Sequence, residues 1–312
     1  MRIWPWMGSL LLSLVACSGD TSADAGSGAC SGPDQLEACR TGWKIAPGST
    51  GVPLHAAWGS KVDDVWAVGS AGAIARWQGT SWSRMESPTT NWLRAVWGGS
   101  ASDVWAAGDL GTILHWDGAA WSPVASPTQV FLNGLWGASG QDVWAVGATG
   151  VILRNQGGGW QAADKPTSWG LTAVWGAAAD DLWAVGGNGT AVHWSGTAWD
   201  KLASPTSSAL YAVWGSGSKD VWAVGTEGAI VHFTGSSWAL VPSPTSETLN
   251  GLWGASAKDL WAVGAGGTLI RWTGTSWFAV PSPTEQMLQA VWGISSGDVW
   301  ALGGGEVLHW KP

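Results

Sequence analysis

Short runs of apolar residues recur along the chain and are separated by turns that contain glycine. One group reads LRAVW over 93–97, DVWAAG over 103–108 and GTILHW over 111–116, and a further run starts at Trp121. Short apolar runs rich in β-branched and aromatic residues and bounded by glycine predict strands of an antiparallel meander. The 3.6-residue spacing of an amphipathic helix is absent from the sequence. We therefore expect four strands in this unit.

The same unit recurs at a fixed interval along the chain. The dipeptide Trp-Gly returns every 39 residues, a period just below the roughly 40 to 45 residues of a WD-type propeller blade and longer than a leucine-rich repeat. Seven copies predict an all-β fold over residues 40–312, a seven-bladed β-propeller with four antiparallel strands per blade. The tryptophans of the seven dipeptides are Trp58, Trp97, Trp136, Trp175, Trp214, Trp253 and Trp292.

The two ends of the repeat region predict that the ring closes on itself. The last unit stops at Trp310-Lys311-Pro312, after its third strand. Near the other end, Trp43 precedes Trp58 by 15 residues, the same interval that separates Trp82 from Trp97. We therefore expect the segment around Trp43 to supply the fourth strand of the last blade and the molecule to be a monomeric ring.

Two turn motifs accompany the strands. Gly-x-x-Gly lies between the second and third strands, where we expect tight hairpins whose glycines tolerate positive φ. Ser-Pro-Thr or Lys-Pro-Thr follows the fourth strand. Proline suits the exit from an edge strand, because its missing N–H weakens no ladder there.

Further tryptophans recur once per unit, at positions that we call columns. Because a residue repeated in every blade serves the blade itself, we interpret the columns as packing between blades and not as stacking platforms for sugars. Burial of an indole removes roughly 150–250 Å² from water, so its replacement by alanine should cost about 3–5 kcal/mol. The second column is Trp66, Trp105, Trp144, Trp183, Trp222, Trp261 and Trp300, and the third is Trp43, Trp82, Trp121, Trp160, Trp199, Trp238 and Trp277. The fourth is Trp77, Trp116, Asn155, Trp194, Phe233, Trp272 and Trp310.

An aspartate also precedes every second strand, and an arginine or histidine follows it twelve residues later, or eleven in the last unit. In a hairpin these two positions lie at the same end of adjacent strands, where they can pair or hydrogen-bond; the aspartate can also accept backbone N–H groups at its turn. A catalytic dyad or a metal site is made once and not seven times, so we expect a structural role. The aspartates are Asp64, Asp103, Asp142, Asp181, Asp220, Asp259 and Asp298, and their expected partners are Arg76, His115, Arg154, His193, His232, Arg271 and His309.

The order of these motifs resembles tectonin-type repeats. The sequence GTSW, at 79–82 and 274–277, is similar to the Asp-box of sialidase-like (BNR-like) propellers, although Trp77 and Trp272 stand where the Asp-box has its acidic residue. The resemblance covers residues 40–312 and implies a propeller. It implies little about activity, because propellers host many functions.

Composition and charge exclude several classes of protein. The chain has 30 Trp and 47 Gly, and 46% of its residues are hydrophobic, which excludes global disorder. Its net charge of -8 offers no basic surface for phosphates, so we expect no nucleic-acid partner. No uninterrupted apolar run reaches the roughly 18 residues of a spanning helix, so we expect none.

The beginning of the chain indicates export. Arg2 and the apolar stretch 7–16 have the form of a signal peptide. The sequence LVAC at 14–17 resembles the lipobox of bacterial lipoproteins, which implies acylation of Cys17 with chains such as palmitate and attachment to the cell envelope. Ser18, and not Asp, follows the cysteine, which by resemblance to the sorting of enterobacterial lipoproteins implies the outer membrane or the cell surface. The alternative is an ordinary cleaved signal peptide with an incidental cysteine.

On this interpretation the chain has three parts. Residues 1–16 are the lipoprotein signal peptide, and residues 17–39 are a flexible tether rich in Gly, Ser and Asp. Cys30 and Cys39 lie in this exported segment, so we expect them to form a disulfide. The propeller occupies residues 40–312, and the whole resembles a Trp-rich bacterial propeller lipoprotein.

Positions that differ between the copies predict where a ligand would bind. The loops after the second and fourth strands of each blade open on one face, and aromatic rings beside polar side chains there suit a sugar or a protein loop. The alternative is that these are loop residues that have drifted and pack onto the rim. The residues before the repeated leucines include Trp92, Phe131, Trp169 and Met287, and those after them are His55, Arg94, Asn133, Thr172, Tyr211, Asn250 and Gln289. Turn residues on the same face are Asp109, Asn188 and Glu227.

The motifs of common enzymes are absent from the sequence. It has no nucleophile elbow, no zinc-binding His pair on a helix and no phosphate-binding loop. A sialidase would need three arginines, and only Arg94 falls on the candidate face, with Arg84 near it in sequence. We therefore expect a non-catalytic, lipid-anchored scaffold in the cell envelope that binds a protein or polysaccharide and uses no cofactor or metal. The alternatives are a lectin-like propeller that binds glycans through Trp92, Arg94, Trp169 and Tyr211 and, less favoured, a sialidase-like glycoside hydrolase.

Overall fold

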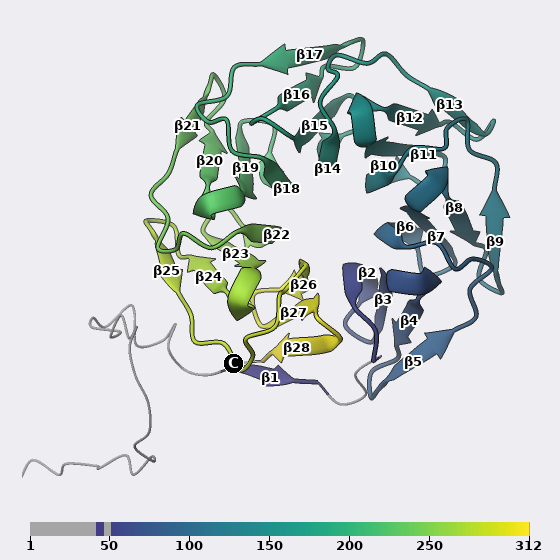
Figure 1. The fold of residues 1–312 in the computed structure, drawn as a ribbon, viewed down its shortest axis with the longest axis horizontal. Helices are drawn as coiled ribbons and strands as arrows, with labels where there is room; N and C mark the ends of the chain where they lie inside the picture. The colour runs from purple at the N-terminus through teal and green to yellow at the C-terminus, as the bar shows by residue number, and fades with distance from the viewer. Residues whose placement is uncertain (1–41, 47–50, 312) are drawn as a thin grey trace, which may run out of the picture.

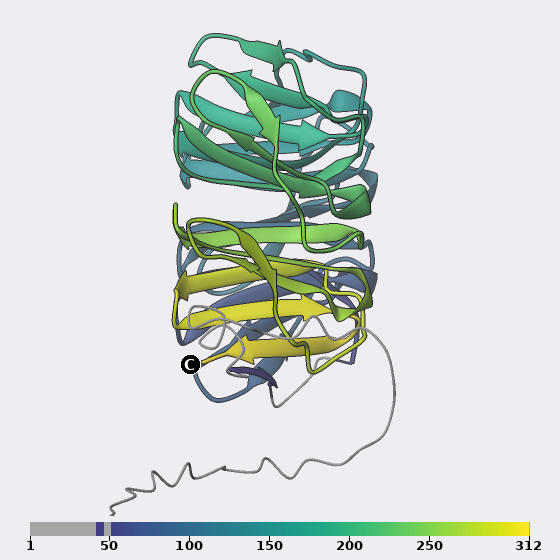
Figure 2. The same ribbon diagram turned by 90° about the vertical axis from the view of Figure 1, so that its left-hand side faces the viewer.

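The computed structural model describes residues 42–46 and 51–311. Seven four-stranded antiparallel sheets stand around a central axis, and Figures 1 and 2 show this ring from one end and from the side. The predicted seven-bladed propeller is therefore confirmed. The predictions for Cys17, Cys30 and Cys39, and for the signal peptide and the tether up to residue 39, lie outside the described residues.

Each blade contributes its strands in chain order from the axis outward. Blade 1 has β2 (Leu54–Lys61), β3 (Asp64–Gly69), β4 (Ile74–Trp77) and β5 (Trp82–Met85); blade 2 has β6 (Leu93–Ser100), β7 (Asp103–Gly108), β8 (Ile113–Trp116) and β9 (Trp121–Val124). Blade 3 has β10 (Leu132–Ser139), β11 (Asp142–Gly147), β12 (Ile152–Asn155) and β13 (Trp160–Ala162); blade 4 has β14 (Leu171–Ala178), β15 (Asp181–Gly186), β16 (Ala191–Trp194) and β17 (Trp199–Leu202). Blade 5 has β18 (Leu210–Gly217), β19 (Asp220–Gly225), β20 (Ile230–Phe233) and β21 (Trp238–Leu240); blade 6 has β22 (Leu249–Ser256), β23 (Asp259–Gly264), β24 (Leu269–Trp272) and β25 (Trp277–Ala279). Blade 7 has β26 (Ala290–Ser295), β27 (Asp298–Gly303) and β28 (Glu306–Trp310), with β1 (Trp43–Ile45) as its fourth strand.

The N-terminal strand closes the ring, as the sequence predicted. Strand β1 pairs antiparallel with β28, and Trp43 lies opposite Trp310. The backbone N–H of Ala46 donates to the carbonyl oxygen of Val307 at 2.7 Å. The first and last strands of the repeat region therefore belong to one sheet, at the lower edge of Figure 1.

The inner strands are longer than the sequence indicated. Strand β6 runs to Ser100 and not only to Trp97, and its register with β7 shifts near both ends. The Trp-Gly dipeptide therefore lies within the strand. The third strand is shorter than the sequence indicated: β8 begins at Ile113 and not at Gly111, because the preceding two residues belong to the turn.

The turn between the second and third strands differs in part from the expected hairpin. Blades 1, 2, 3, 5 and 6 form a single turn of 3-10 helix there. Gly111 has the expected positive φ of 68° and Leu110 before it has a φ of 54°, but Gly108 is extended, with a φ of -172°. A Cβ at Gly108 would collide with the carbonyl oxygen of Trp92, so the first glycine is required by close contact and not by its φ. The five turns are η1 (Ser70–Gly72), η2 (Asp109–Gly111), η3 (Ala148–Gly150), η4 (Thr226–Gly228) and η5 (Ala265–Gly267).

The hydrophobic core lies between neighbouring blades. The buried Trp66 of blade 1 packs against two rings of blade 2: Trp121 at 5.4 Å in an edge-to-face arrangement, and Trp116 at 5.0 Å. The same edge-to-face contact joins Trp43 to Trp261 at 5.3 Å, where the ring closes. These contacts confirm that the second and third tryptophan columns serve packing between blades.

The Trp-Gly dipeptides form a second row of contacts nearer the axis. A Cβ placed on Gly137 would lie 2.6 Å from the indole of Trp97 in the preceding blade. The equivalent distance from Gly59 to Trp292, across the ring closure, is also 2.6 Å. Each dipeptide therefore supplies an indole to one neighbour and leaves room for the indole of the other.

The aspartate column pairs as the sequence predicted, in all seven blades. Asp142 accepts two hydrogen bonds from Arg154, at 2.8 and 2.9 Å, and Asp220 lies 2.5 Å from His232 Nε2. Each cation or imidazole also lies over the indole of the second strand; the His232 and Trp222 rings are stacked at 3.7 Å. The remaining pairs are Asp64 with Arg76, Asp103 with His115, Asp181 with His193, Asp259 with Arg271 and Asp298 with His309.

Candidate functional site

The turns after the second strands meet the loops that enter the inner strands at one end of the ring. The backbone N–H of Asp109 in η2 donates to the carbonyl oxygen of Trp92 at 2.9 Å, and Ala148 in η3 donates to Phe131 at 2.8 Å. Because these bonds recur from blade to blade, the turns and loops form one surface. We call this end of the ring the mouth face. The aspartate pairs lie at the opposite end, where the first and second strands join.

Large apolar side chains are exposed on the mouth face. Trp92, Phe131 and Trp169 are 47%, 44% and 49% exposed, whereas the tryptophans of the second column are buried. Met287, on the loop that enters blade 7, is 48% exposed. The aromatic residues therefore occupy three successive blades, 2 to 4. In blades 1, 5 and 6 the residues before the repeated leucines are Pro53, Ala209 and Thr248.

A depression of about 620 Å³ opens at the centre of the mouth face. The polar residues that follow the repeated leucines all line it, so the structure brings together the predicted ring of unlike side chains. A narrower continuation of about 190 Å³ follows the axis and is lined largely by small and aliphatic side chains such as Ala95, Gly134 and Leu135. The central depression is lined by His55, Arg94, Asn133, Thr172, Tyr211, Thr248, Asn250, Ala265, Met287 and Gln289.

Three of these polar residues connect neighbouring blades. Asn133 donates through Nδ2 to the carbonyl oxygen of Leu171 at 2.8 Å, and Asn250 donates in the same way to Leu288 at 2.9 Å. Thr172 donates to the carbonyl oxygen of Leu210 at 2.6 Å. These side chains therefore hold the inner strands in place and have less capacity left for a ligand.

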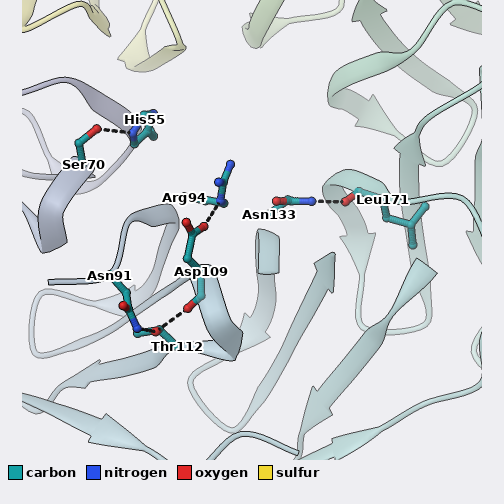
Figure 3. A network of polar contacts seen from close by, with 8 residues as sticks. All are labelled: His55, Ser70, Asn91, Arg94, Asp109, Thr112, Asn133 and Leu171. Carbon is teal, nitrogen blue, oxygen red and sulfur yellow. Dashed lines mark hydrogen bonds and ion pairs between the residues drawn. The ribbon is translucent and has the colours of Figure 1, made fainter. Parts of the chain in front are cut away.

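Arg94 forms the centre of the charged part of the mouth. Its Nε donates to Asp109, as Figure 3 shows, and its guanidinium carbon lies 5.0 Å from the centre of the Phe131 ring. Thr112 donates to the carbonyl oxygen of Asp109 at 2.6 Å, which fixes the turn that carries this carboxylate. The sequence analysis placed Asp109 on this face but did not identify it as the partner of Arg94. A signal was present, since each residue occurs at its position in blade 2 only.

His55 lies beside this pair and is held on two sides. Its Nε2 lies 3.0 Å from Ser70 Oγ, and its ring stacks on Trp92 at 5.3 Å. Burial lowers the pKa of His55, the charge of Arg94 lowers it further, and Asp109 partly opposes both. The imidazole is therefore neutral at physiological pH. It offers a flat ring to its surroundings, and its Nε2 is already hydrogen-bonded to Ser70.

The other candidate residues divide between the centre and the rim. Tyr211 lines the central depression, and its hydroxyl has no hydrogen-bond partner among the residues that the structure describes. Trp92, Phe131, Trp169 and Glu227 lie outside the central lining, on the surrounding loops and turns. Leu110 in η2, 62% exposed, joins the apolar rim and was missed, because its exposure follows from the left-handed turn.

Arg84 lies away from the central depression. It belongs to the outer strand β5 and lines a separate depression with Met85 and Glu86. Within residues 42–46 and 51–311, therefore, no cluster of three arginines forms at the mouth. Nor does this part of the chain contain a group of His, Cys, Asp and Glu side chains arranged to hold a metal, or a helix long and apolar enough to cross a membrane.

A further depression, of about 510 Å³, opens at the outer edge between blades 3 and 4. Its lining includes Arg154 and Trp194. The guanidinium of Arg154 is already bonded to Asp142 and lies 4.5 Å from the Trp144 ring. Arg154 therefore stabilises the blade, which leaves Asp164 as the other charged residue of the lining, and the mouth face is the better candidate site.

Comparison with known proteins identifies the architecture. No protein-family model and no curated protein sequence matches the chain. Among solved structures, YCF48 from Cyanidioschyzon merolae is 20% identical, with a TM-score of 0.71 over 87% of this chain and 99% of that one. YCF48 bound to a D1 peptide is 17% identical, with a TM-score of 0.71 over 87% and 97%. A streptogramin B lyase is 15% identical, with a TM-score of 0.77 over 86% and 96%. At these identities the likeness shows the fold alone, and this fold serves both a peptide-bound protein and a lyase.

Proposed function

We propose that this protein is a non-catalytic binding or scaffold module whose mouth face holds a segment of protein or polysaccharide. The observation that carries the proposal is the exposed rim of Trp92, Phe131 and Trp169 around a polar central depression. Exposed aromatic side chains beside a concave polar surface mark binding sites more often than ordinary surface. The YCF48 structure with a bound D1 peptide is a precedent for binding by a similar propeller.

The chemistry of the mouth favours binding over catalysis. The ionisable groups of the central depression are His55, Arg94 and Tyr211, and Arg94 is neutralised by Asp109 beside it. His55 Nε2 lies 3.0 Å from Ser70 Oγ, but among the described residues no third group bonds to the imidazole to orient it as a base, which an activated serine requires. A streptogramin B lyase shares the fold, so this argument rests on the side chains and not on the architecture.

We also propose that the ring is displayed on a lipid anchor in the cell envelope. The proposal rests on the lipobox-like sequence at 14–17 and on the place where the described chain begins. Trp43 pairs with Trp310, at the end of β28 that is remote from the turn joining Gly303 to Glu306 on the mouth face. The described chain therefore enters the ring at the end opposite the mouth face. Metabolic labelling with a palmitate analogue tests the anchor: the wild type should take up label and Cys17→Ser should not.

Parallel capture experiments test the binding proposal. Purified Cys17→Ser protein, which lacks the acylation site, would be applied to a glycan array and used to capture ligands from envelope extract. Trp92→Ala and Trp169→Ala should each abolish the specific signal, because aromatic anchors dominate binding energies. Ile294→Ala is the matched control, since Ile294 is also exposed but lies near the opposite end of β26. Signals that survive both tryptophan changes would contradict the proposal, and a glycan-array signal lost with Trp92→Ala would identify the lectin-like alternative.

A further inference from the structure

The mouth face divides into two unlike halves. Of the five large apolar side chains that the described residues expose on the mouth face, Trp92, Leu110, Phe131 and Trp169 belong to blades 2 to 4 or to the loops that enter them, and Met287 lies on the loop that enters blade 7. The charged side chains of the arc formed by blades 2 to 4 are the ion pair of Arg94 with Asp109, together with Glu86 on the loop that enters blade 2 and Asp164 and Lys165 on the loop that enters blade 4. Two positive and three negative side chains leave the arc, rich in exposed apolar groups, with a net charge of only -1.

The other half carries unpaired acidic side chains. Glu227 lies in η4 of blade 5, and Glu247 and Glu285 lie on the loops that enter blades 6 and 7. All three are exposed, and none forms an ion pair with any residue in the described part of the chain. The loops belong to the mouth face, because Ala265 in η5 donates to the carbonyl oxygen of Thr248, the residue after Glu247, at 2.9 Å.

The basic residues of the same blades lie at the opposite end of the ring. Lys219 is in the turn between β18 and β19, and Lys258 is in the turn between β22 and β23. These turns are on the side of the aspartate pairs. These two lysines therefore do not neutralise the glutamates that blades 5 and 6 carry on the mouth face.

We propose that the occupant of the mouth face is a cationic, amphipathic polypeptide segment, an inference that rests on the proposed binding function. Its apolar side chains would pack on Trp92, Phe131 and Trp169, and its Lys or Arg side chains would face Glu227, Glu247 and Glu285. Complementary charge fixes orientation and accelerates association. A net charge of -8 adds long-range attraction for a basic partner. A neutral polysaccharide would use the aromatic arc and leave the glutamates without a role.

Short fluorescent peptides of one apolar pattern test this assignment. The peptides share their Leu and Phe positions and carry Lys, Gln or Glu at the others, and fluorescence anisotropy at low and high salt gives their affinities for the Cys17→Ser protein. At low salt we expect the Lys peptide to bind at least about tenfold more tightly than the Gln peptide. High salt should remove most of this advantage, because the charges are exposed. Trp92→Ala should weaken both peptides by about tenfold or more.

A matched pair of triple variants isolates the charge. Glu227→Gln with Glu247→Gln and Glu285→Gln should bring the affinity for the Lys peptide down to that for the Gln peptide and leave the Gln peptide unchanged. The control, Asp63→Asn with Asp180→Asn and Asp200→Asn, removes three exposed acidic groups away from the mouth face and should preserve the advantage of the Lys peptide. The melting temperatures of both variants, compared with that of the wild type, test whether the ring is intact.

The outcomes separate this inference from the proposed function. If the Gln or Glu peptide binds as tightly as the Lys peptide, or if the glutamate variant keeps the Lys advantage, the cationic assignment is wrong. Should the peptides fail to bind while a glycan signal depends on Trp92, the occupant is a glycan and the assignment is again overturned, although the mouth face is still the binding site. If neither tryptophan variant affects any ligand, both proposals fall.

Discussion

The smallest recurring contact in this ring joins one glycine to one indole. The indole of Trp97 lies where a side chain at Gly137 would project, and the same contact recurs between the other blades. Dense packing leaves no free volume for an extra methyl group at such a point. The Trp-Gly dipeptide is therefore a joint between blades, and its glycine has a steric role that the repeat pattern alone does not reveal.

Alanine at this glycine should destabilise the ring. In Gly137→Ala the new Cβ would lie 2.6 Å from the Trp97 ring, and such overpacking costs about 1–3 kcal/mol. Urea unfolding followed by circular dichroism measures the loss. Gly158→Ala is the matched control, because no atom lies within 4 Å of a Cβ there, and its effect should stay within about 0.5 kcal/mol. Equal stability of the two variants would show that the indole can move aside.

Among the elements, the second and third strands of each blade are tied together at one end by an aspartate. In blade 5, Asp220 lies 2.5 Å from His232 Nε2 and also accepts a hydrogen bond from the indole of Trp222 at 3.0 Å. The imidazole of His232 in turn stacks on that indole. One carboxylate thus orients both the imidazole and the indole of Trp222, which packs against Trp272 and Trp277 of blade 6.

Removal of this carboxylate should lower the melting temperature. Asp220→Ala leaves two partly buried donors without their acceptor, which costs about 1–3 kcal/mol. Differential scanning calorimetry measures the shift. Asp200→Ala, an exposed aspartate on the edge strand β17, should leave the melting temperature nearly unchanged. The pairing would have no energetic importance if Asp220→Ala melted with the wild type.

The histidine of blade 7 should make stability depend on pH. Burial lowers the pKa of His309 from its ordinary value of 6.5, against the opposing effect of Asp298. The unfolded chain therefore binds a proton at a higher pH than the folded ring does, so stability falls as the pH drops through about 6.5. In His309→Gln the free energy of unfolding should decrease less between about pH 7.5 and about pH 5.5 than in the wild type. Parallel urea titrations at the two pH values provide the measurement, and equal decreases would contradict the prediction.

Sequence periodicity predicted the elements well and the site only in part. The fixed interval of 39 residues defines the blades, and the position of Trp43 predicts the closing strand. Both predictions succeed because equivalent positions in the seven copies adopt the same backbone structure. The roles of Asn133 and Asn250 could not be predicted in this way. Each bonds to a carbonyl group of the next blade, and a single sequence does not say which backbone oxygen a side chain reaches. Arg94 and Asp109 were both placed on the face, but their pairing became evident only in the structure.

At the scale of the whole molecule, one short strand determines whether seven blades form a closed ring. Strand β1 is held by its pairing with β28 and by the contact of Trp43 with Trp261 in blade 6. In every other blade a short loop joins the fourth strand to the third, whereas β1 is connected to β28 only through the rest of the ring, so a released β1 is not held close to its partner. The ring closure is therefore the place where local opening should begin.

Hydrogen exchange on matched tryptophan variants tests this idea. Trp43→Ala and Trp121→Ala remove equivalent edge-to-face contacts, with Trp261 at 5.3 Å and with Trp66 at 5.4 Å, and each should cost about 3–5 kcal/mol. In Trp43→Ala we expect the amides of β28 to exchange much faster than in the wild type, because release of β1 exposes that strand as an edge. In Trp121→Ala, β8 should stay better protected, since β9 is joined to it by a short loop and re-forms its pairing readily. Similar protection of β28 and β8 in the two variants would mean that closure depends on the contacts between blades and not on the shared strand.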